Sequence, residues 1–484
     1  MGQSNAQRIH TGAQYFSGNT RLEHDLLGER NVPLESYYGV QTLRAVENFT
    51  ISGVNLSFYP AIVNGLAMVK EAAAEANHDL GLLPTDIRDA IVTACHEIRN
   101  GKYHNHFVVD MIQGGAGTST NMNANEVIAN RALEIMGHQR GEYQFCHPNN
   151  HVNLSQSTND AYPTAMKLGI FILNNELTEV LDSLASAFQS KAVEFRDVIK
   201  MGRTQLQDAV PMTLGQEFQA YADMLHGESD QLNKAADGFL EQNMGATAIG
   251  TGINAEPGYA EKCTEHLRRV TGFPVRLAAN LVQATQDTSD FVRYSSELKR
   301  LAVKVSKICN DLRLLASGPR AGLSEINLPP RAPGSSIMPG KVNPVIPEVV
   351  NQVAFKVIGN DTTVTMAVEG GQLELNVFEP VAVQSIVESI VMLKNGLKTL
   401  EHRCVSGITA NRERCKSLVY NSIGIVTALN PVIGYEKSTI VAKEALEKNA
   451  SVYDLVLEKK WLTKEQLDEI LSPERMIEPR KVRL

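Results

Sequence analysis

Apolar residues recur at helical spacing through the middle of this chain, most clearly between positions 291 and 315. There the apolar positions are separated alternately by three and four residues, the spacing of a continuous helix face that packs along a neighbouring helix. Asp287 or Thr288 can cap the start of this helix, and Gly318-Pro319 ends it. We therefore predict a helix well above average length, which needs partner helices along its side. The apolar positions are Phe291, Tyr294, Leu298, Leu301, Val305, Ile308, Leu312 and Leu315.

Further segments repeat this pattern, so the predicted fold is mainly α with a central bundle of long helices. These segments span 164–199, 214–244, 347–367 and 381–400. The segment 107–109 suggests a short strand, but strands and helices do not alternate as a parallel sheet requires. Shorter helices and turns occupy both flanks. We accordingly predict three domains: an N-terminal mainly helical domain (1–154), the central bundle (155–410) and a small C-terminal helical domain (411–484).

Composition narrows the function classes. With 484 residues, 43% apolar and 21% charged, the chain is long enough for two or three domains and ordinary for a globular protein. Its 46 basic and 54 acidic residues leave a net charge of −8, which offers no general footprint for nucleic acid. The six cysteines lie far apart, so we expect reduced thiols rather than a zinc site or a disulfide framework. Because residues 1–30 lack an apolar signal core and no run approaches membrane-spanning length, we predict a cytoplasmic protein that does not enter the membrane.

A long irregular segment, Gly318 to Gly340, leads into the densest concentration of chemistry in this chain. Residues 334–344 read GSSIMPGKVNP and place two hydroxyls, an ammonium and a carboxamide among glycines and prolines. A Walker-type phosphate loop is a poor match, because five residues rather than four separate its glycines and Val342 stands where a hydroxyl is needed. Long irregular segments inside compact proteins are usually functional. We interpret this one as a mobile loop that grips a carboxylate, with a structural Gly/Pro connector as the alternative.

Three more polar clusters precede helices, at 113–121, 155–160 and 202–209. The first invites comparison with a dinucleotide-binding turn, but Thr120 occupies the place of the third glycine and the strand–helix repeat is missing. Amides and hydroxyls at a helix start suit an anion such as a carboxylate, and plain helix capping is the alternative. In the second cluster, Asn159 or Asp160 is the expected cap. If the bundle assembles these clusters, they form a small anion pocket rich in hydroxyls and amides.

Together these motifs resemble those of the aspartase/fumarase superfamily, and the resemblance covers nearly the whole chain. The loop GSSIMPGKVNP is similar to the superfamily's signature, and GGAGTSTNMNANEV, SQSTND, GRTQLQDAVPMTLGQEF and GTGIN complete the match. Within the superfamily the chain is most similar to the aspartate ammonia-lyases, which interconvert L-aspartate with fumarate and ammonium. The resemblance implies three mainly helical domains, a homotetramer built around the central bundle, and active sites that combine residues of three chains.

The resemblance also implies a role for individual polar residues. Ser335 would be the general base that removes the C3 proton of aspartate, and Ser336 would help to hold the dianionic intermediate. Lys341 and Asn343 would bind the carboxylate that accepts the charge. The other carboxylate and the amino group would be bound by Thr118, Ser157, Thr158, Asn159 and Thr204. This scheme requires no cofactor and no metal, and the sequence leaves activation by a divalent cation such as Mg2+ open.

These residue types suit the chemistry. A proton next to a carboxylate is very weakly acidic, and its removal creates an enediolate whose two negative charges need preorganised donors. Two positions depart from the fumarases, because Gln205 replaces a histidine and Thr158 replaces a second serine. Glutamine does not titrate near neutral pH, and ammonia needs less acid assistance than hydroxide to leave, so an ammonia-lyase is favoured. The alternatives are a class II fumarate hydratase and a non-catalytic helical scaffold of the same superfamily.

Overall fold

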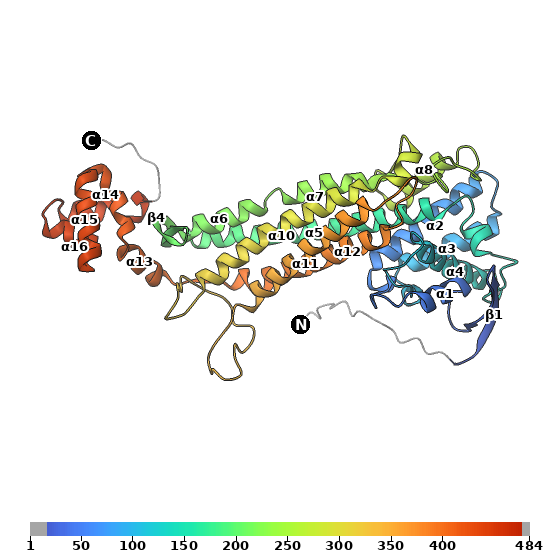
Figure 1. Cartoon of the computed structure of the whole chain (residues 1–484), viewed down its shortest axis with the longest axis horizontal. Helices are drawn as coiled ribbons and strands as arrows, with labels where there is room; N and C mark the ends of the chain where they lie inside the picture. Colours follow the sequence, from blue (N-terminus) through green and yellow to red (C-terminus); the bar gives the residue numbers. More distant parts are fainter. Residues whose placement is uncertain (1–16, 477–484) are drawn as a thin grey trace. The chain divides into compact units, whose positions relative to one another are not determined.

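The computed structural model describes residues 17–476, and most of them lie in helices (Figure 1). The described chain divides into two compact units. Unit 1 comprises the described part of Met1–Leu177, Asp230–Arg300 and Lys356–Met392. Unit 2 comprises Thr178–Ser229, Leu301–Phe355 and the described part of Leu393–Leu484. The prediction of a mainly α fold is confirmed, and the three-domain division with boundaries after 154 and 410 stays a prediction.

Unit 1 holds the N-terminal helices and several short elements from later in the chain. Its strands are β1 (Thr20–Asp25), β2 (Gly28–Pro33), β5 (Glu241–Gln242) and β6 (Arg276–Leu277). Its helices are α1 (Val40–Asn48), α2 (Pro60–Asp79), α3 (Thr85–Arg99), α4 (Thr118–Ile135), α8 (Tyr259–Thr271) and α9 (Leu281–Gln286). Its single turns of helix are η1 (Leu56–Phe58), η2 (His104–His106), the π-helical η3 (Pro148–Val152) and η4 (Asp237–Leu240).

Unit 2 holds a β-hairpin, the C-terminal helices and two short strands. Its strands are β3 (Ile199–Thr204), β4 (Gln207–Thr213), β7 (Ile326–Asn327) and β8 (Thr409–Ala410). Its helices are α6 (Leu214–Leu225), η5 (Val405–Gly407), α13 (Arg412–Tyr420), η6 (Ile423–Ile425), α14 (Val426–Ile433), α15 (Tyr435–Lys448), α16 (Val452–Glu458), α17 (Lys464–Ile470) and α18 (Pro473–Met476). The helices with residues in both units are α5 (Thr158–Glu194), α7 (Glu228–Ala236), α10 (Ser289–Leu315), α11 (Val345–Glu369) and α12 (Glu379–Arg403).

The predicted apolar face of α10 is buried along its whole length. Each of its eight apolar positions is at most 4% exposed. Polar pairs accompany this packing: in unit 1 the Tyr294 hydroxyl donates to Asn174 of α5, and in unit 2 Asn351 of α11 donates to the Ser306 carbonyl of α10. Because buried polar groups need partners, these bonds fix how the helices align. The prediction for 291–315 is therefore confirmed.

The segment 214–244, predicted as one helix, is instead divided into α6, α7 and η4. Gly227 lies between α6 and α7 with φ of +79°, a left-handed conformation that ends a helix and favours glycine. The expected single helix is therefore wrong at this point. The helix expected at 164–199 begins earlier, at Thr158, and ends at Glu194, before β3.

The strand expected at 107–109 is also absent from the described structure. This segment is hydrogen-bonded to η1 rather than to a strand: the Phe107 carbonyl accepts from Ser57 N–H, and the Val109 carbonyl accepts from Leu56 N–H. A helical turn offers only these isolated donors, so no ladder forms. The described strands form four two-stranded sheets, of which β1–β2, β3–β4 and β7–β8 are antiparallel and β5–β6 is parallel.

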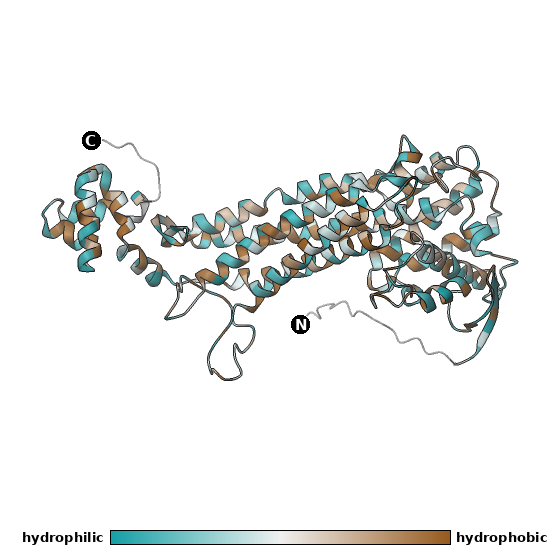
Figure 2. Cartoon of the chain, in the orientation of Figure 1, coloured by the Kyte–Doolittle hydropathy of each residue, from teal (hydrophilic) through white to brown (hydrophobic). Residues whose placement is uncertain are grey.

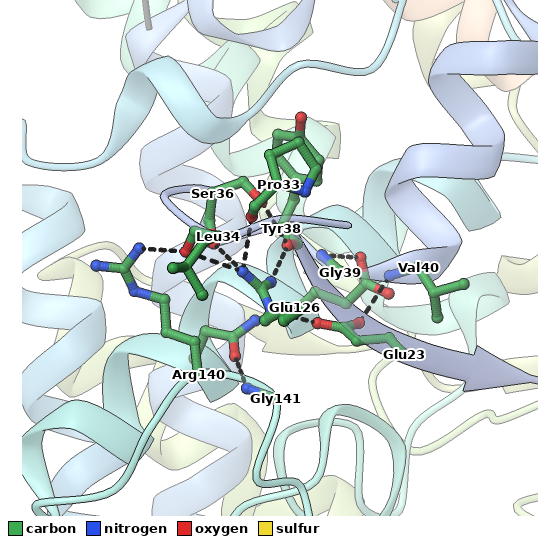
Figure 3. Close-up of polar contacts among 12 residues, drawn as sticks. Glu23, Pro33, Leu34, Ser36, Tyr38, Gly39, Val40, Glu126, Arg140 and Gly141 are labelled. Carbon is green, nitrogen blue, oxygen red and sulfur yellow. Dashed lines mark hydrogen bonds and ion pairs between the residues drawn. The ribbon is translucent and has the colours of Figure 1, made fainter. Parts of the chain in front are cut away.

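The N-terminal hairpin β1–β2, with Thr20 opposite Pro33 and Asp25 opposite Gly28, is joined to the helices of unit 1 by buried carboxylates (Figure 3). Glu126 of α4 accepts three backbone N–H groups at the start of α1, those of Gly39, Gln41 and Thr42. Unpaired N–H groups at a helix start bind a carboxylate well, so Glu126 caps α1 from another helix. A Cβ on Gly39 would lie 2.6 Å from Glu23 Oε2, so this approach requires glycine.

The C-terminal helices of unit 2 share an apolar cluster with β3. Val419, Leu429, Val441 and Leu455 are buried there against Met201 of the hairpin. Helix α17 begins with a capping box, in which Thr463 and Gln466 bond each other's backbone N–H. All six cysteines are free and buried. Within residues 17–476, none of the helices combines the length and the apolar content that crossing a membrane demands.

Candidate active site

The residues predicted to form the site fall into two sets, one in each unit. The first set, in unit 1, is Thr118, Ser157, Thr158 and Asn159. The second set, in unit 2, is Thr204, Ser335, Ser336, Lys341 and Asn343. Each of these nine side chains is exposed or half-buried, so each set is accessible to a small molecule.

Thr118 is placed by the turn before α4. Gly115, Ala116 and Gly117 all have φ between +54° and +91°, so the chain enters the helix through three left-handed residues. A Cβ on Gly117 would lie 2.5 Å from the Tyr162 ring, which makes glycine necessary there. The Thr118 hydroxyl donates to the Gly115 carbonyl at 2.8 Å, and its side chain is exposed at the first turn of α4. The backbone N–H groups of Thr118 and Thr120 are paired as well, with the Gly115 carbonyl and with Gln113 Oε1.

The start of α5 carries the other three residues of the first set. The Ser157 hydroxyl accepts the Asn159 N–H at 3.2 Å, and Asp160 accepts the Ser157 N–H at 2.9 Å. Ser157 therefore caps the helix, and the expectation of Asn159 or Asp160 as cap is wrong. Asp160 is instead buried as an acceptor that also takes the N–H groups of Gly245 and Thr247, and its burial raises its pKa to about 6.

Asn159 is held on both its backbone and its side chain. Pro163 lies inside α5 and has no N–H to give to the Asn159 carbonyl one turn earlier. That carbonyl instead accepts from Asn243 Nδ2 at 3.0 Å, and Asn159 Nδ2 donates to the Ala248 carbonyl at 2.7 Å. The first turn of α5 is thus locked to the segment after β5.

The starts of α4 and α5 meet through a buried polar network. Asn121, in the first turn of α4, donates from Nδ2 to the Thr158 hydroxyl oxygen at 3.3 Å. Asn121 Oδ1 accepts from the ammonium of Lys70, a residue of α2 with no exposed surface. Sequence reasoning missed Lys70 and Asn121. The available signal was a lysine on the apolar face of the Ala-rich helix α2, where a charge needs buried partners.

In unit 2, the loop 334–343 folds back on itself. Gly334 N–H donates to the Lys341 carbonyl at 2.7 Å, and Asn343 Nδ2 donates to the Gly334 carbonyl at 2.7 Å. A Cβ on Gly334 would lie 2.4 Å from that Lys341 oxygen, so the closure requires glycine. Ser335, Lys341 and their neighbours line a cavity of about 450 Å³, and Lys341 and Asn343 also line a second cavity of about 690 Å³.

Ser335 differs from its neighbour Ser336 in its surroundings. Its hydroxyl oxygen accepts two backbone N–H groups, from Ile337 at 3.2 Å and from Met338 at 3.1 Å. Donors directed at a hydroxyl oxygen stabilise its deprotonated form and so lower the pKa of the group. Ser335 is half-buried and Ser336 is exposed. Of the two serines, Ser335 is therefore the less exposed one and has two backbone donors on its hydroxyl oxygen.

Thr204 lies at the tip of the hairpin β3–β4. The two turn residues, Gln205 and Leu206, have φ of +53° and +65°, the left-handed pair of a type I′ turn. A positive φ costs conformational energy in residues other than glycine, and backbone strain of this kind is common at functional sites. Arg203, next to Thr204, forms an ion pair at 2.7 Å with Glu325, a buried carboxylate that sequence reasoning also missed.

Comparisons with known proteins show which family this chain belongs to. A lyase family model matches residues 28–359, and a model of the fumarase C C-terminus matches residues 425–478. Aspartate ammonia-lyase of Pseudomonas aeruginosa is 61% identical over 96% of this chain and 98% of its own length. The enzyme of that name from Escherichia coli is 56% identical over 96% of this chain and 97% of its own length.

Solved structures show the same fold. A fumarate lyase:delta crystallin from Brucella melitensis bound to cobalt matches with a TM-score of 0.92 and 55% identity, covering 95% of this chain and all of that one. The class II fumarase of Schistosoma mansoni matches with a TM-score of 0.88 and 37% identity, covering 94% and 99% of the two chains. The aspartase/fumarase-like fold is therefore confirmed, and identity is higher to the ammonia-lyases than to this fumarase. The chain belongs to the aspartate ammonia-lyase group of the aspartase/fumarase superfamily.

Proposed function

We propose that the protein is a carbon–nitrogen lyase that reversibly deaminates L-aspartate to fumarate and ammonium, with Ser335 as the base that takes the C3 proton. The observation that carries the proposal is the pair of N–H donors on the Ser335 hydroxyl oxygen. An ordinary serine hydroxyl is far too weak an acid to act as a base near neutral pH. Two fixed donors shift the protonation equilibrium of the hydroxyl toward the alkoxide, and Lys341 adds a cation in the same loop.

Removal of the proton places two negative charges on one carboxylate of the substrate. Lys341 and Asn343 bind this enediolate, and Ser336 assists them. Preorganised donors are worth a few kcal/mol each toward such charge, because they do not have to reorient during the reaction. Thr118, Ser157, Thr158, Asn159 and Thr204 hold the second carboxylate and the amino group.

The leaving group separates the two enzymatic candidates. Water leaves as hydroxide and needs an acid, whereas an amine leaves as a readily protonated base. Gln205, at the hairpin tip, supplies no titratable group beside Thr204. The runner-up is a class II fumarate hydratase, favoured by the structural match to the Schistosoma mansoni fumarase. Purified protein should convert aspartate to fumarate, followed by ultraviolet absorbance. Turnover of malate without turnover of aspartate would reverse this order.

Ser335→Ala tests the base, with Ser336→Ala as its neighbour in the same loop. A general base typically contributes about 10²–10⁴-fold, so Ser335→Ala should lower kcat by at least that factor while succinate still binds. Ser336→Ala should lose less, because Ser336 is exposed and serves only as one donor to the intermediate. Equal activity of wild type and Ser335→Ala would show that another group takes the proton.

We also propose a homotetramer whose active sites combine residues of three chains. Helix α11 supports assembly, because it exposes Val349, Phe355, Ile358 and Met366, each at 37% or more, and apolar surface of this kind marks interfaces. Apolar positions run along this helix in Figure 2. Mixing the inactive variants Thr158→Val and Ser335→Ala after subunit exchange should restore activity, because some sites then receive both intact sets. Failure to recover activity in exchanged tetramers would place both sets in one chain.

The proposed reaction needs no metal, because ammonium, amide and hydroxyl groups carry the charge of the intermediate. Enzyme treated with a chelator and then desalted should keep its activity with aspartate. Restoring Mg2+ to the same sample tests whether a divalent cation activates the enzyme. A non-catalytic scaffold would show no turnover with aspartate or malate under any of these conditions.

A further inference from the structure

Lys70 is a buried ammonium whose three acceptors are all amide oxygens. It lies on α2 with no exposed surface, and Nζ donates to Asn121 Oδ1 at 2.7 Å, Gln156 Oε1 at 2.8 Å and Asn153 Oδ1 at 3.0 Å. A buried charge is costly unless it is hydrogen-bonded, and here its three N–H groups are satisfied without a contacting carboxylate. Burial lowers the pKa of Lys70 to about 7, and the charge of Asp160 opposes that shift, so the lysine is an ammonium below that pH.

An ammonium has only donors, so it dictates the orientation of each amide that touches it. Asn121 must turn Oδ1 toward Lys70 and Nδ2 away from it. Nδ2 then donates to Asn153 Oδ1 at 3.0 Å and to the Thr158 hydroxyl oxygen at 3.3 Å. With the opposite orientation, Asn121 would present an oxygen to Thr158, and the Thr158 O–H would point inward to it.

The direction of these bonds decides what Thr158 can offer a ligand. A threonine hydroxyl has one hydrogen to donate and two lone pairs. Because its oxygen already accepts from Asn121, its hydrogen remains for a group outside the network. A substrate carboxylate carries acceptors only, so it needs that hydrogen.

We propose that Lys70 is a positioning residue, which directs the Thr158 O–H toward a substrate carboxylate by fixing the orientation of the Asn121 amide. The inference rests on the proposed function only in taking Thr158 as a carboxylate ligand. Lys70 itself touches no substrate.

A double-mutant cycle on succinate affinity, measured by calorimetry, tests the relay, and KM and kcat with aspartate are measured for wild type and Lys70→Met. A hydrogen bond to a charged group typically contributes about 10–100-fold to binding. Lys70→Met should weaken succinate by about 10-fold or more and raise KM, with a smaller change in kcat. In the Thr158→Val background the same substitution should change affinity by less than about 3-fold, because the hydroxyl it acts on is gone. If Lys70→Met weakened succinate binding by the same factor in the wild-type and Thr158→Val backgrounds, the proposal would be overturned.

Asn121→Asp distinguishes the direction of the hydrogen bond between residues 121 and 158 from the stability of the buried network. The new carboxylate keeps the contact with Lys70 as an ion pair but cannot donate, so the Thr158 O–H turns inward and succinate should weaken about 10-fold. Asn153→Asp is the matched control: it places the same charge on the same ammonium without touching Thr158, and affinity should stay within about 3-fold of wild type. Equal weakening by both variants, or wild-type affinity in Asn121→Asp, would overturn the proposal.

Failure of the proposed activity and failure of the proposed role of Lys70 would give different results in these measurements. Succinate binding does not depend on turnover. Wild-type protein that binds succinate but leaves aspartate unchanged would remove the proposed activity and leave the Lys70 relay intact. If Lys70→Met does not fold, Asn121→Asp and Asn153→Asp still decide the matter, because both keep the ammonium paired.

Discussion

Glu325 offers the sharpest test of how unit 2 is held together. This residue has no exposed surface and lies just before β7, ahead of the Ser335 loop. Its carboxylate forms ion pairs with two cations of β3, Lys200 at 3.1 Å and Arg203 at 2.7 Å. Its backbone bonds Leu315 at the end of α10 and Asn411 at the start of α13. One side chain and its backbone therefore join the hairpin, a long helix and the C-terminal helices.

Glu325→Gln keeps the shape of this side chain and removes its charge. Breaking a buried ion pair typically costs about 3–5 kcal/mol, because the remaining charge stays buried without its partner. Lys200 keeps Glu217 at 2.5 Å, and the Arg203 side chain is 14% exposed and reaches some water. We therefore expect the low end of that range, about 3 kcal/mol.

Glu217→Gln is the matched control. The Glu217 side chain is 19% exposed and forms an ion pair with Lys200. In Glu217→Gln, Lys200 would still form its ion pair with Glu325. A partly exposed pair of this kind is worth about 1 kcal/mol. Urea unfolding followed by circular dichroism, at one protein concentration, should give a clearly lower midpoint for Glu325→Gln than for Glu217→Gln, with equal slopes. Equal midpoints for the two variants would refute the reasoning that Glu325 joins these elements.

Three further substitutions test other parts of the structure. Gly39→Ala should lower the free energy of unfolding by about 1–3 kcal/mol in urea, because its Cβ would meet Glu23 Oε2 at 2.6 Å, whereas Gly396→Ala meets only ordinary contacts at 3.6 Å and should be neutral. Burial lowers the pKa of His106 to about 4, so the unfolded chain binds the extra proton below about pH 6.5 and wild type should lose up to about 3 kcal/mol as the pH falls toward 4. His106→Gln should remove that part of the pH dependence of the urea midpoint. If the midpoint of this variant changed with pH as steeply as that of wild type, the prediction would be contradicted. Lys341→Ala should raise KM and lower kcat for aspartate in steady-state kinetics, and a change in KM alone would show that Lys341 does not stabilise the intermediate.

Local patterns predicted those parts of the molecule whose structure is decided by near neighbours. The α10 seam is periodic, and its buried face follows from that period. The break at Gly227 was not predicted, because isolated glycines inside an apolar periodic segment are often tolerated. The turn at the hairpin tip was not predicted, because Gln205 and Leu206 are not usual turn residues, yet both adopt positive φ. Ser157 rather than its neighbours caps α5, because Asp160 is drawn inward to the Gly245 and Thr247 amides.

The amino-acid sequence by itself determined the helical faces, the polar loop at 334–344 and the family, because periodicity and motif spacing are properties of consecutive residues. Only the tertiary structure decided which donors point at which acceptors. The two amides on Ser335 depend on how the loop folds back, and the orientation of Asn121 depends on an ammonium supplied from α2. Hydrogen-bond direction is set by partners brought together in space, and a lysine at position 70 carries no local sign of the asparagine at position 121 that it orients.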